Sequence, residues 1–187
     1  YGFIAFGHSS ISYHVSDLEN TKKVIQELDQ RCDIIIVSFH GGAEGSGAQH
    51  VPNEVEKYYG ENRGNLIKFT HTAIDAGADV ILGHGPHVLR AMELYEGKLI
   101  CYSLGNFITY GNVSLSGVKG KGAIVQIEVD DITGNFKSGN IVATKQRAPG
   151  IAYLDDENYA VELIQTLSKE DFPNSNLLIS NKGELTI

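Results

Sequence analysis

The sequence predicts an α/β fold in which a parallel βαβ unit is followed by antiparallel strands. Two apolar runs, "DIIIVSF" (33–39) and "ADVILG" (78–83), are continuous, as expected for strands that are covered on both faces. A segment with helical periodicity, residues 66–77, lies between them. After residue 90 the chain changes to alternating apolar and polar residues, which is typical of antiparallel strands.

The first elements are a strand and a helix. "GFIAFG" (2–7) predicts a short buried strand. The pattern "SDLE" (16–19) predicts a capping box, in which Ser16 accepts from the backbone of Glu19. Apolar residues at helical spacing follow it, so we expect a helix that begins near residue 17.

The βαβ unit spans residues 33–83. Its two strands should be parallel with a right-handed crossover, so their carboxyl ends meet at one edge of the sheet. Ligands of open α/β sheets bind beyond such ends. Residues 41–65 show no clear period, and a segment of this length without obvious structure is often functional.

The last third of the chain predicts strands and one helix. A hairpin turns at Glu96-Gly97, and 122–130 alternates as a strand with one wet face. After the turn "DITGN", the run "FKSGNIVATKQ" returns as a strand, and a helix over 156–168 precedes a polar tail.

Composition narrows the class of protein. With 187 residues the chain suffices for one domain, and the formal net charge of −8 disfavours nucleic-acid binding. No apolar run approaches the ~18 residues that a membrane span needs. Cys32 and Cys101 lack metal-type spacing and are interpreted as separate buried thiols.

Three histidines follow the ends of the predicted parallel strands. His40 ends the first strand, and His84 and His87 follow the second across Gly85 and Pro86. Because imidazole is a common metal ligand, three such rings at one edge predict a site for Zn, Fe, Mn or Ni. A purely structural role for these histidines is the alternative.

Three further residues are candidates for the same site. Glu44 lies four residues after His40 and is suited to orient an imidazole or transfer a proton, which makes it the candidate catalytic residue. Asn106 follows another strand end, and His50 lies in the long loop; both are candidate substrate contacts. We interpret His8, His14 and His71 as ordinary structural histidines.

Four motifs in this order resemble the CapA family of bacterial capsule synthesis and poly-γ-glutamate biosynthesis proteins. They are "HGGAEG", "DAGAD", "GHGPH" and "YSLGNF", and the resemblance is strongest over 33–107. The family is similar in fold to calcineurin-like metallophosphoesterases, which hold two metal ions at strand ends. The resemblance implies that His40 and His84 bind one divalent ion (Mn, Fe or Zn), that His87 binds the other, and that Glu44 matches the acidic position of the motif.

The resemblance also implies that part of the domain is absent. The chain begins at Tyr1 in a strand-like run, so we expect residues 1–187 to be the C-terminal part of a single CapA-like domain whose N-terminal half is missing. The remaining metal ligands would lie in that half. We therefore expect an incomplete metal site and an inactive fragment.

For the full-length protein the resemblance implies a metal-dependent, phosphoesterase-like hydrolase in capsule or poly-γ-glutamate biosynthesis. The alternative is a non-catalytic assembly or polymer-binding component of a capsule export complex. Expected partners are an anionic polymer or phosphoester substrate and other capsule-synthesis proteins, although a protein of charge −8 repels an acidic polymer at long range. The expected location is extracytoplasmic, with any membrane anchor in the missing N-terminal part.

Overall fold

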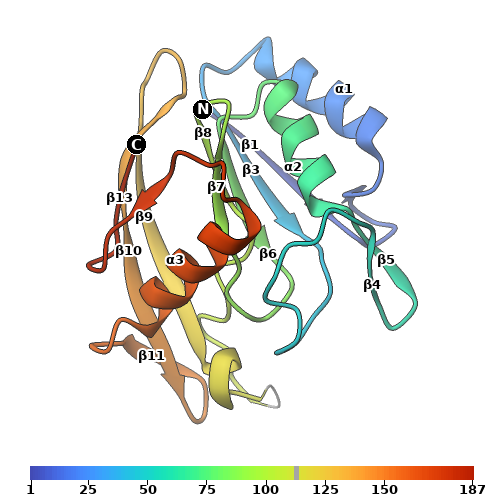
Figure 1. The fold of residues 1–187 in the computed structure, drawn as a ribbon. Helices are drawn as coiled ribbons and strands as arrows, with labels where there is room; N and C mark the ends of the chain where they lie inside the picture. Colours follow the sequence, from blue (N-terminus) through green and yellow to red (C-terminus); the bar gives the residue numbers. More distant parts are fainter. Residues whose placement is uncertain (112–113) are drawn as a thin grey trace.

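The computed structural model describes residues 1–111 and 114–187, and within them two β-sheets and three α-helices form the body of the protein (Figure 1). The first sheet has the strand order β2-β1-β3-β6-β8-β7. Its strands are β1 (Gly2–Gly7), β2 (Tyr13–His14), β3 (Ile35–His40), β6 (Val80–His84), β7 (Met92–Tyr95) and β8 (Lys98–Cys101).

The second sheet is built from the last third of the chain. Its path is β11-β10-β13-β12, and β9 pairs with β10. These strands are β9 (Lys121–Val129), β10 (Phe136–Arg147), β11 (Ile151–Leu154), β12 (Leu178–Ile179) and β13 (Glu184–Thr186). The helices are α1 (Leu18–Asp29), α2 (Leu66–Asp75) and α3 (Tyr159–Asp171), and a 3-10 turn, Gly117–Gly120, precedes β9.

The predicted βαβ unit is confirmed. Strands β3 and β6 pair in parallel, and the register places His40 opposite His84. Strand β1 lies parallel to β3 on its other side, and β8 lies parallel to β6. The carboxyl ends of these four neighbouring strands therefore lie at one edge of the sheet.

Helices α1 and α2 cover one face of the first sheet (Figure 1). Alternate residues of β3, Ile35, Val37 and Phe39, are buried in the core beneath them. The Phe39 ring meets the Phe69 ring of α2 with centroids 5.4 Å apart. Since side chains alternate along a strand, His40 leaves β3 on the opposite face, which these helices do not cover.

The second sheet and α3 cover part of that opposite face (Figure 1). Leu99 and Cys101 of β8 are buried with Phe136 of β10 and Ile164 of α3 in a second apolar core. At the other end of the sheet the face is open, because Phe3 of β1 is 67% exposed. The second sheet and α3 therefore leave this face uncovered near β1.

Helix α1 begins one residue later than its capping pattern predicts. Asp17 is the N-cap, and its side chain accepts from the backbone N–H of Asn20 at 3.1 Å. The Ser16 hydroxyl instead meets His14 Nδ1 at 2.7 Å. The prediction of Ser16 as the cap was wrong because this local partner, contributed by β2, engages the hydroxyl.

Two regions hold more structure than their polar sequences predict. The segment 41–65 contains a small hairpin of β4 (Glu56–Tyr58) and β5 (Glu61–Gly64). Tyr59 and Gly60 form the turn between them, with φ of 48° and 81° in the left-handed region. The polar tail contributes β12 and β13 to the second sheet, and Leu185 of β13 is fully buried in the second apolar core. Helix α3 also begins at Tyr159 rather than at residue 156.

The predicted hairpin at Glu96-Gly97 is confirmed. The hairpin of β7 and β8 turns at Glu96 and Gly97, both with positive φ. Cys32 and Cys101 are free; Cys101 is buried, while Cys32 is only partly so. Within the described residues, no helix combines the length and the apolar character that crossing a membrane requires.

Candidate functional site

Histidines follow the carboxyl ends of three neighbouring parallel strands. His8 comes directly after β1, His40 ends β3 and His84 ends β6. The rings of His8 and His40 lie 5.4 Å apart between centroids. His40 and His84 are register partners, so their side chains leave the sheet on the same face. We call His8, His40, His84 and His87 the histidine edge.

The loops after β3 and β6 interlock and shape this edge. The backbone N–H of Gly41 donates to the His84 carbonyl at 3.0 Å, and that of Gly45 donates to the Pro86 carbonyl at 2.9 Å. Gly85 has φ of 120°, and a Cβ there would lie 2.6 Å from the Gly41 carbonyl oxygen. Only glycine permits this close approach.

His87 is turned toward His40 by an uncommon backbone conformation. Its φ is 58°, in the left-handed region that non-glycine residues rarely adopt. The His87 and His40 ring centroids are 6.4 Å apart. His87 Nδ1 lies 2.8 Å from Asn106 Oδ1, and Asn106 is 5% exposed. The Asn106 amide therefore faces His87 rather than open solvent.

Glu44 is held beside His87 by an arginine. Arg63 donates to Glu44 Oε1 at 2.8 Å, while Glu44 Oε2 lies 3.9 Å from His87 Nε2. Arg63 also pairs with Glu61 at 2.9 Å. One oxygen of Glu44 is thus occupied by Arg63, and the other is directed to the histidine edge.

The surroundings favour neutral rings at two positions. Burial lowers the pKa of His40, and nearby His8 and His87 lower it further because a second positive charge there is unfavourable. Burial also lowers the pKa of His84. A neutral imidazole keeps a lone pair available at neutral pH, as a metal ligand or a base requires.

The structure brings together five of the six predicted site residues. His40, His84, His87, Glu44 and Asn106 gather at one edge, through β3, β6 and the loops that follow them. His50 is placed elsewhere: its Nδ1 bonds Asp171 at the end of α3 at 2.7 Å. Its predicted contact with substrate has no support from this position.

Sequence reasoning missed His8 and Arg63. A usable signal existed for His8, because "GFIAFG" is followed by histidine just as the strands before His40 and His84 are. His8 joins the edge because β1 lies beside β3, which the sequence alone does not show. Arg63 had no comparable signal, since it lies 19 residues from Glu44 in an irregular polar segment.

The residues suit a metal ion in type but not in number. Neutral imidazoles and a carboxylate are donors that Zn, Mn and Fe accept in proteins. Yet in the chain outside residues 112–113, no three His, Cys, Asp or Glu side chains lie close enough together to hold a metal ion. A complete site would need further ligands or a rearrangement of these side chains.

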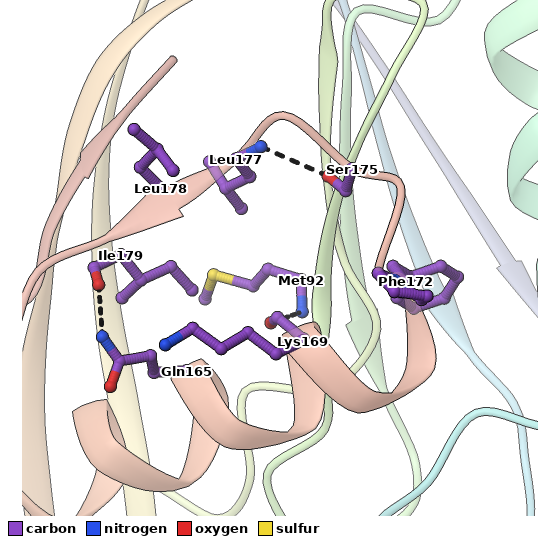
Figure 2. Close-up of a pocket in the computed structure, with 10 residues that line it drawn as sticks. Met92, Gln165, Lys169, Phe172, Ser175, Leu177, Leu178 and Ile179 are labelled. Atoms are coloured by element: carbon purple, nitrogen blue, oxygen red, sulfur yellow. Dashed lines mark hydrogen bonds between the residues drawn. The ribbon is translucent and has the colours of Figure 1, made fainter.

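A pocket lies away from the histidine edge, between α3 and the segment that follows it (Figure 2). Met92, Phe172, Leu177 and Ile179 make its walls largely apolar, and its volume is about 230 Å³. It contains none of the predicted site residues. We therefore place the candidate site at the histidine edge, where the titratable groups converge.

Residues 5–110 match the model of the family described as bacterial capsule synthesis protein PGA_cap. The matched segment makes up more than half of the chain and contains all of the histidine edge. The chain belongs to the PGA_cap family. Its site residues therefore lie within the part of the chain that defines the family.

Curated relatives of this PGA_cap chain include two Bacillus proteins. It is 38% identical over 85 residues to the PGA biosynthesis protein CapA of Bacillus subtilis, and 34% identical over 91 residues to the capsule biosynthesis protein CapA of Bacillus anthracis. These segments cover 46% and 49% of the chain. They span only about a fifth, 19%, of the length of each relative.

A third relative is the probable polyglutamine synthesis accessory protein MT0602 of Mycobacterium tuberculosis. The identity is 37% over 76 residues, which is 41% of this chain and 17% of that protein.

Proposed function

We propose that this chain is part of a capsule or poly-γ-glutamate biosynthesis protein, and that its histidine edge contributes ligands to a metal-dependent, phosphoesterase-like hydrolytic site. The names of the relatives support the biosynthetic role. The observation that carries the site is the meeting of His40, His84 and His87 at the carboxyl ends of parallel strands.

In this proposal each residue has a separate task. His40, His84 and His87 would hold Mn, Fe or Zn. A bound ion supplies a water of pKa about 7 and polarises a phosphoryl or acyl oxygen. Glu44 moves a proton at the free Oε2 that faces the edge, and Arg63 keeps this carboxylate in place by binding its other oxygen.

The remaining ligands would come from outside these 187 residues. In the same proposal the two sheets are part of a calcineurin-like sandwich, and a further segment completes both the fold and the site. The protein would act outside the cytoplasm on an anionic polymer or a phosphoester, together with other capsule-synthesis proteins. A metal ion would offset the repulsion between an acidic substrate and a chain of charge −8.

The test compares metal content and hydrolysis in the longer protein that contains this chain. We expect stoichiometric metal by elemental analysis, and turnover of a phosphodiester or of poly-γ-glutamate. His40→Ala and His84→Ala should lower turnover by more than about 100-fold, beyond the 10–100-fold typical of losing an outer partner of a ligand. His71→Ala is the matched control, because His71 lies on α2 and bonds Glu93.

Two results would contradict the proposal. One is metal-free protein that hydrolyses these substrates at the same rate as metal-loaded protein. The other is tight binding of poly-γ-glutamate without any turnover, which would favour a non-catalytic component of a polymer assembly complex. For the 187-residue chain alone we expect no hydrolysis, since its described donors are too few for a metal site.

A further inference from the structure

The amide of Asn106 has only one orientation that satisfies its neighbours. Asn106 Nδ2 lies 2.9 Å from the carbonyl oxygen of Lys119 and 3.2 Å from that of His87. Both carbonyls accept hydrogen bonds only, so the NH₂ group must face them. The amide oxygen must then face His87 Nδ1, from which it is separated by 2.8 Å.

This orientation decides where the proton of His87 resides. An amide oxygen only accepts, so His87 Nδ1 must carry hydrogen to donate to it. In a neutral imidazole the other nitrogen then holds the lone pair. That nitrogen, Nε2, is the atom that lies 3.9 Å from Glu44 Oε2 at the histidine edge.

We propose that Asn106 is a positioning residue that fixes His87 as its Nδ1–H tautomer and directs the Nε2 lone pair toward the histidine edge. The same amide donates to the His87 carbonyl, which supports the left-handed backbone at φ 58°. One buried side chain thus sets both the rotation and the tautomer of the ring. The use of that lone pair as a metal ligand or as a base rests on the proposed function; the tautomer itself does not.

Two other histidines serve as references for the tautomer. His14 Nδ1 accepts from the backbone N–H of Ser16 at 3.2 Å, so its neutral ring should carry hydrogen on Nε2. His71 Nε2 lies 3.0 Å from a Glu93 oxygen, which only accepts when ionised, so this ring should also carry hydrogen on Nε2. His87 should differ from both.

The decisive measurement is ¹⁵N NMR of the histidine rings in the metal-free 187-residue chain at about pH 8.5, above the ordinary histidine pKa of about 6.5. We expect a protonated Nδ1 and an unprotonated Nε2 for His87, and the reverse for His14 and His71. An Nε2–H signal from His87 in the wild-type chain would overturn the proposal without any variant being needed.

Variants then test whether Asn106 is the cause. Asn106→Ala should lower the ratio of Nδ1–H to Nε2–H in His87 by about tenfold, the ratio that one net hydrogen bond supports. Asn106→Asp keeps an acceptor for Nδ1–H and should preserve the tautomer. An unchanged ratio in Asn106→Ala would contradict the proposal, and the His14 and His71 signals report whether the fold is intact.

Titration with Co²⁺ alone separates this proposal from the proposed function. If the histidine edge of the longer protein binds Co²⁺, Asn106→Ala should weaken the affinity for Co²⁺ by about 10–100-fold. If the longer wild-type protein binds no Co²⁺ while His87 is in the Nδ1–H form, the proposed metal site is wrong and the role of Asn106 in setting the tautomer stands.

Discussion

The guanidinium of Arg90 is completely buried and meets the carboxylate of Glu56 through two hydrogen bonds, of 2.7 and 2.9 Å. Arg90 Nε also donates to the Ala48 carbonyl at 2.6 Å, and Glu56 accepts from the backbone N–H of Ala43 at 3.0 Å. This ion pair therefore holds the loop on both sides of Glu44, at Ala43 and at Ala48. A hydrophobic residue in place of Arg90 would leave a carboxylate buried without its partner.

We expect Arg90→Met to lower the free energy of unfolding by about 3–5 kcal/mol, since the charge of Glu56 would remain uncompensated. Urea denaturation measures this change. Arg31→Met, at an exposed residue after α1, is the control and should change stability by less than about 0.5 kcal/mol. An equally small loss of stability in Arg90→Met and Arg31→Met would contradict this prediction. Arg90→Met combined with Glu56→Gln should recover part of the loss.

At the scale of elements, serines protect the outer edge of β7. Among the strands of the described residues, it pairs with β8 and ends the sheet. On its free side, Met92 N donates to Ser168 Oγ at 2.8 Å, and Leu94 N donates to Ser175 Oγ at 2.9 Å. Figure 2 draws the first of these as the dashed line from the Met92 nitrogen. An edge whose N–H groups are bonded in this way is unavailable for pairing with another strand.

Ser168→Ala should destabilise the protein by about 1–3 kcal/mol, because the buried N–H of Met92 would lose its acceptor. Thr166→Ala is the matched control on the same helix: its hydroxyl bonds Glu162 O on the exposed side of α3. Thermal or urea unfolding measures both. Faster exchange of the Met92 amide hydrogen should accompany the loss in Ser168→Ala, and an unchanged exchange rate would argue against this role of the serine.

A second link between elements is the carboxylate of Asp155, which precedes α3. Lys121 of β9 donates to it at 2.7 Å and Lys145 of β10 at 2.9 Å. Burial by itself raises the pKa of Asp155, but these hydrogen bonds and charges outweigh it and lower the pKa below its ordinary value of 3.8. The ionised form is therefore favoured by folding.

This shift predicts a loss of stability in acid. Because the folded-state pKa of Asp155 is the lower one, its contribution is fully present above pH 3.8 and is lost as the pH falls through the folded-state pKa. Asp155→Asn should cost about 1.5–3 kcal/mol at pH 7, and the difference from wild type should shrink below about pH 4. Denaturation at several pH values tests this; a difference that is constant down to pH 2 would contradict it.

At the scale of the whole molecule, the first sheet is covered unequally. Helices α1 and α2 bury one face along β1, β3 and β6, whereas the second sheet and α3 cover the other face near β6, β8 and β7 (Figure 1). Ile35 of β3 is fully buried under the helices, while Phe3 of β1 is 67% exposed on the other face. The two side chains lie on neighbouring strands but in opposite environments.

Truncating these two side chains tests the arrangement of layers. Ile35→Ala should lower the free energy of unfolding by about 2–5 kcal/mol through lost burial and a cavity. Phe3→Ala should change it by less than about 0.5 kcal/mol, because most of its ring already contacts water. Urea denaturation of this chain measures both. A large loss in Phe3→Ala would mean that this face is covered in solution.

The central strands and helix, and the edge of the sheet at which chemistry could occur, were predictable from the sequence. Continuous apolar runs predicted β3 and β6, helical spacing predicted α2, and the rule that parallel strands end together placed His40 and His84 at one edge. These features are local or follow from a single crossover. The turn at Glu96 and Gly97 was predictable for the same reason, since its chemistry lies in neighbouring residues.

The contacts among the site residues depend on tertiary packing and were not predictable from the sequence. The partner of His87 lies 19 residues away at Asn106, Glu44 bonds Arg63 of β5, and His8 joins the edge because β1 pairs with β3. His50 instead bonds Asp171, which lies 121 residues later in the chain. Spacing along the chain carries no information about such pairs, because they depend on where packed strands, loops and α3 bring distant side chains together.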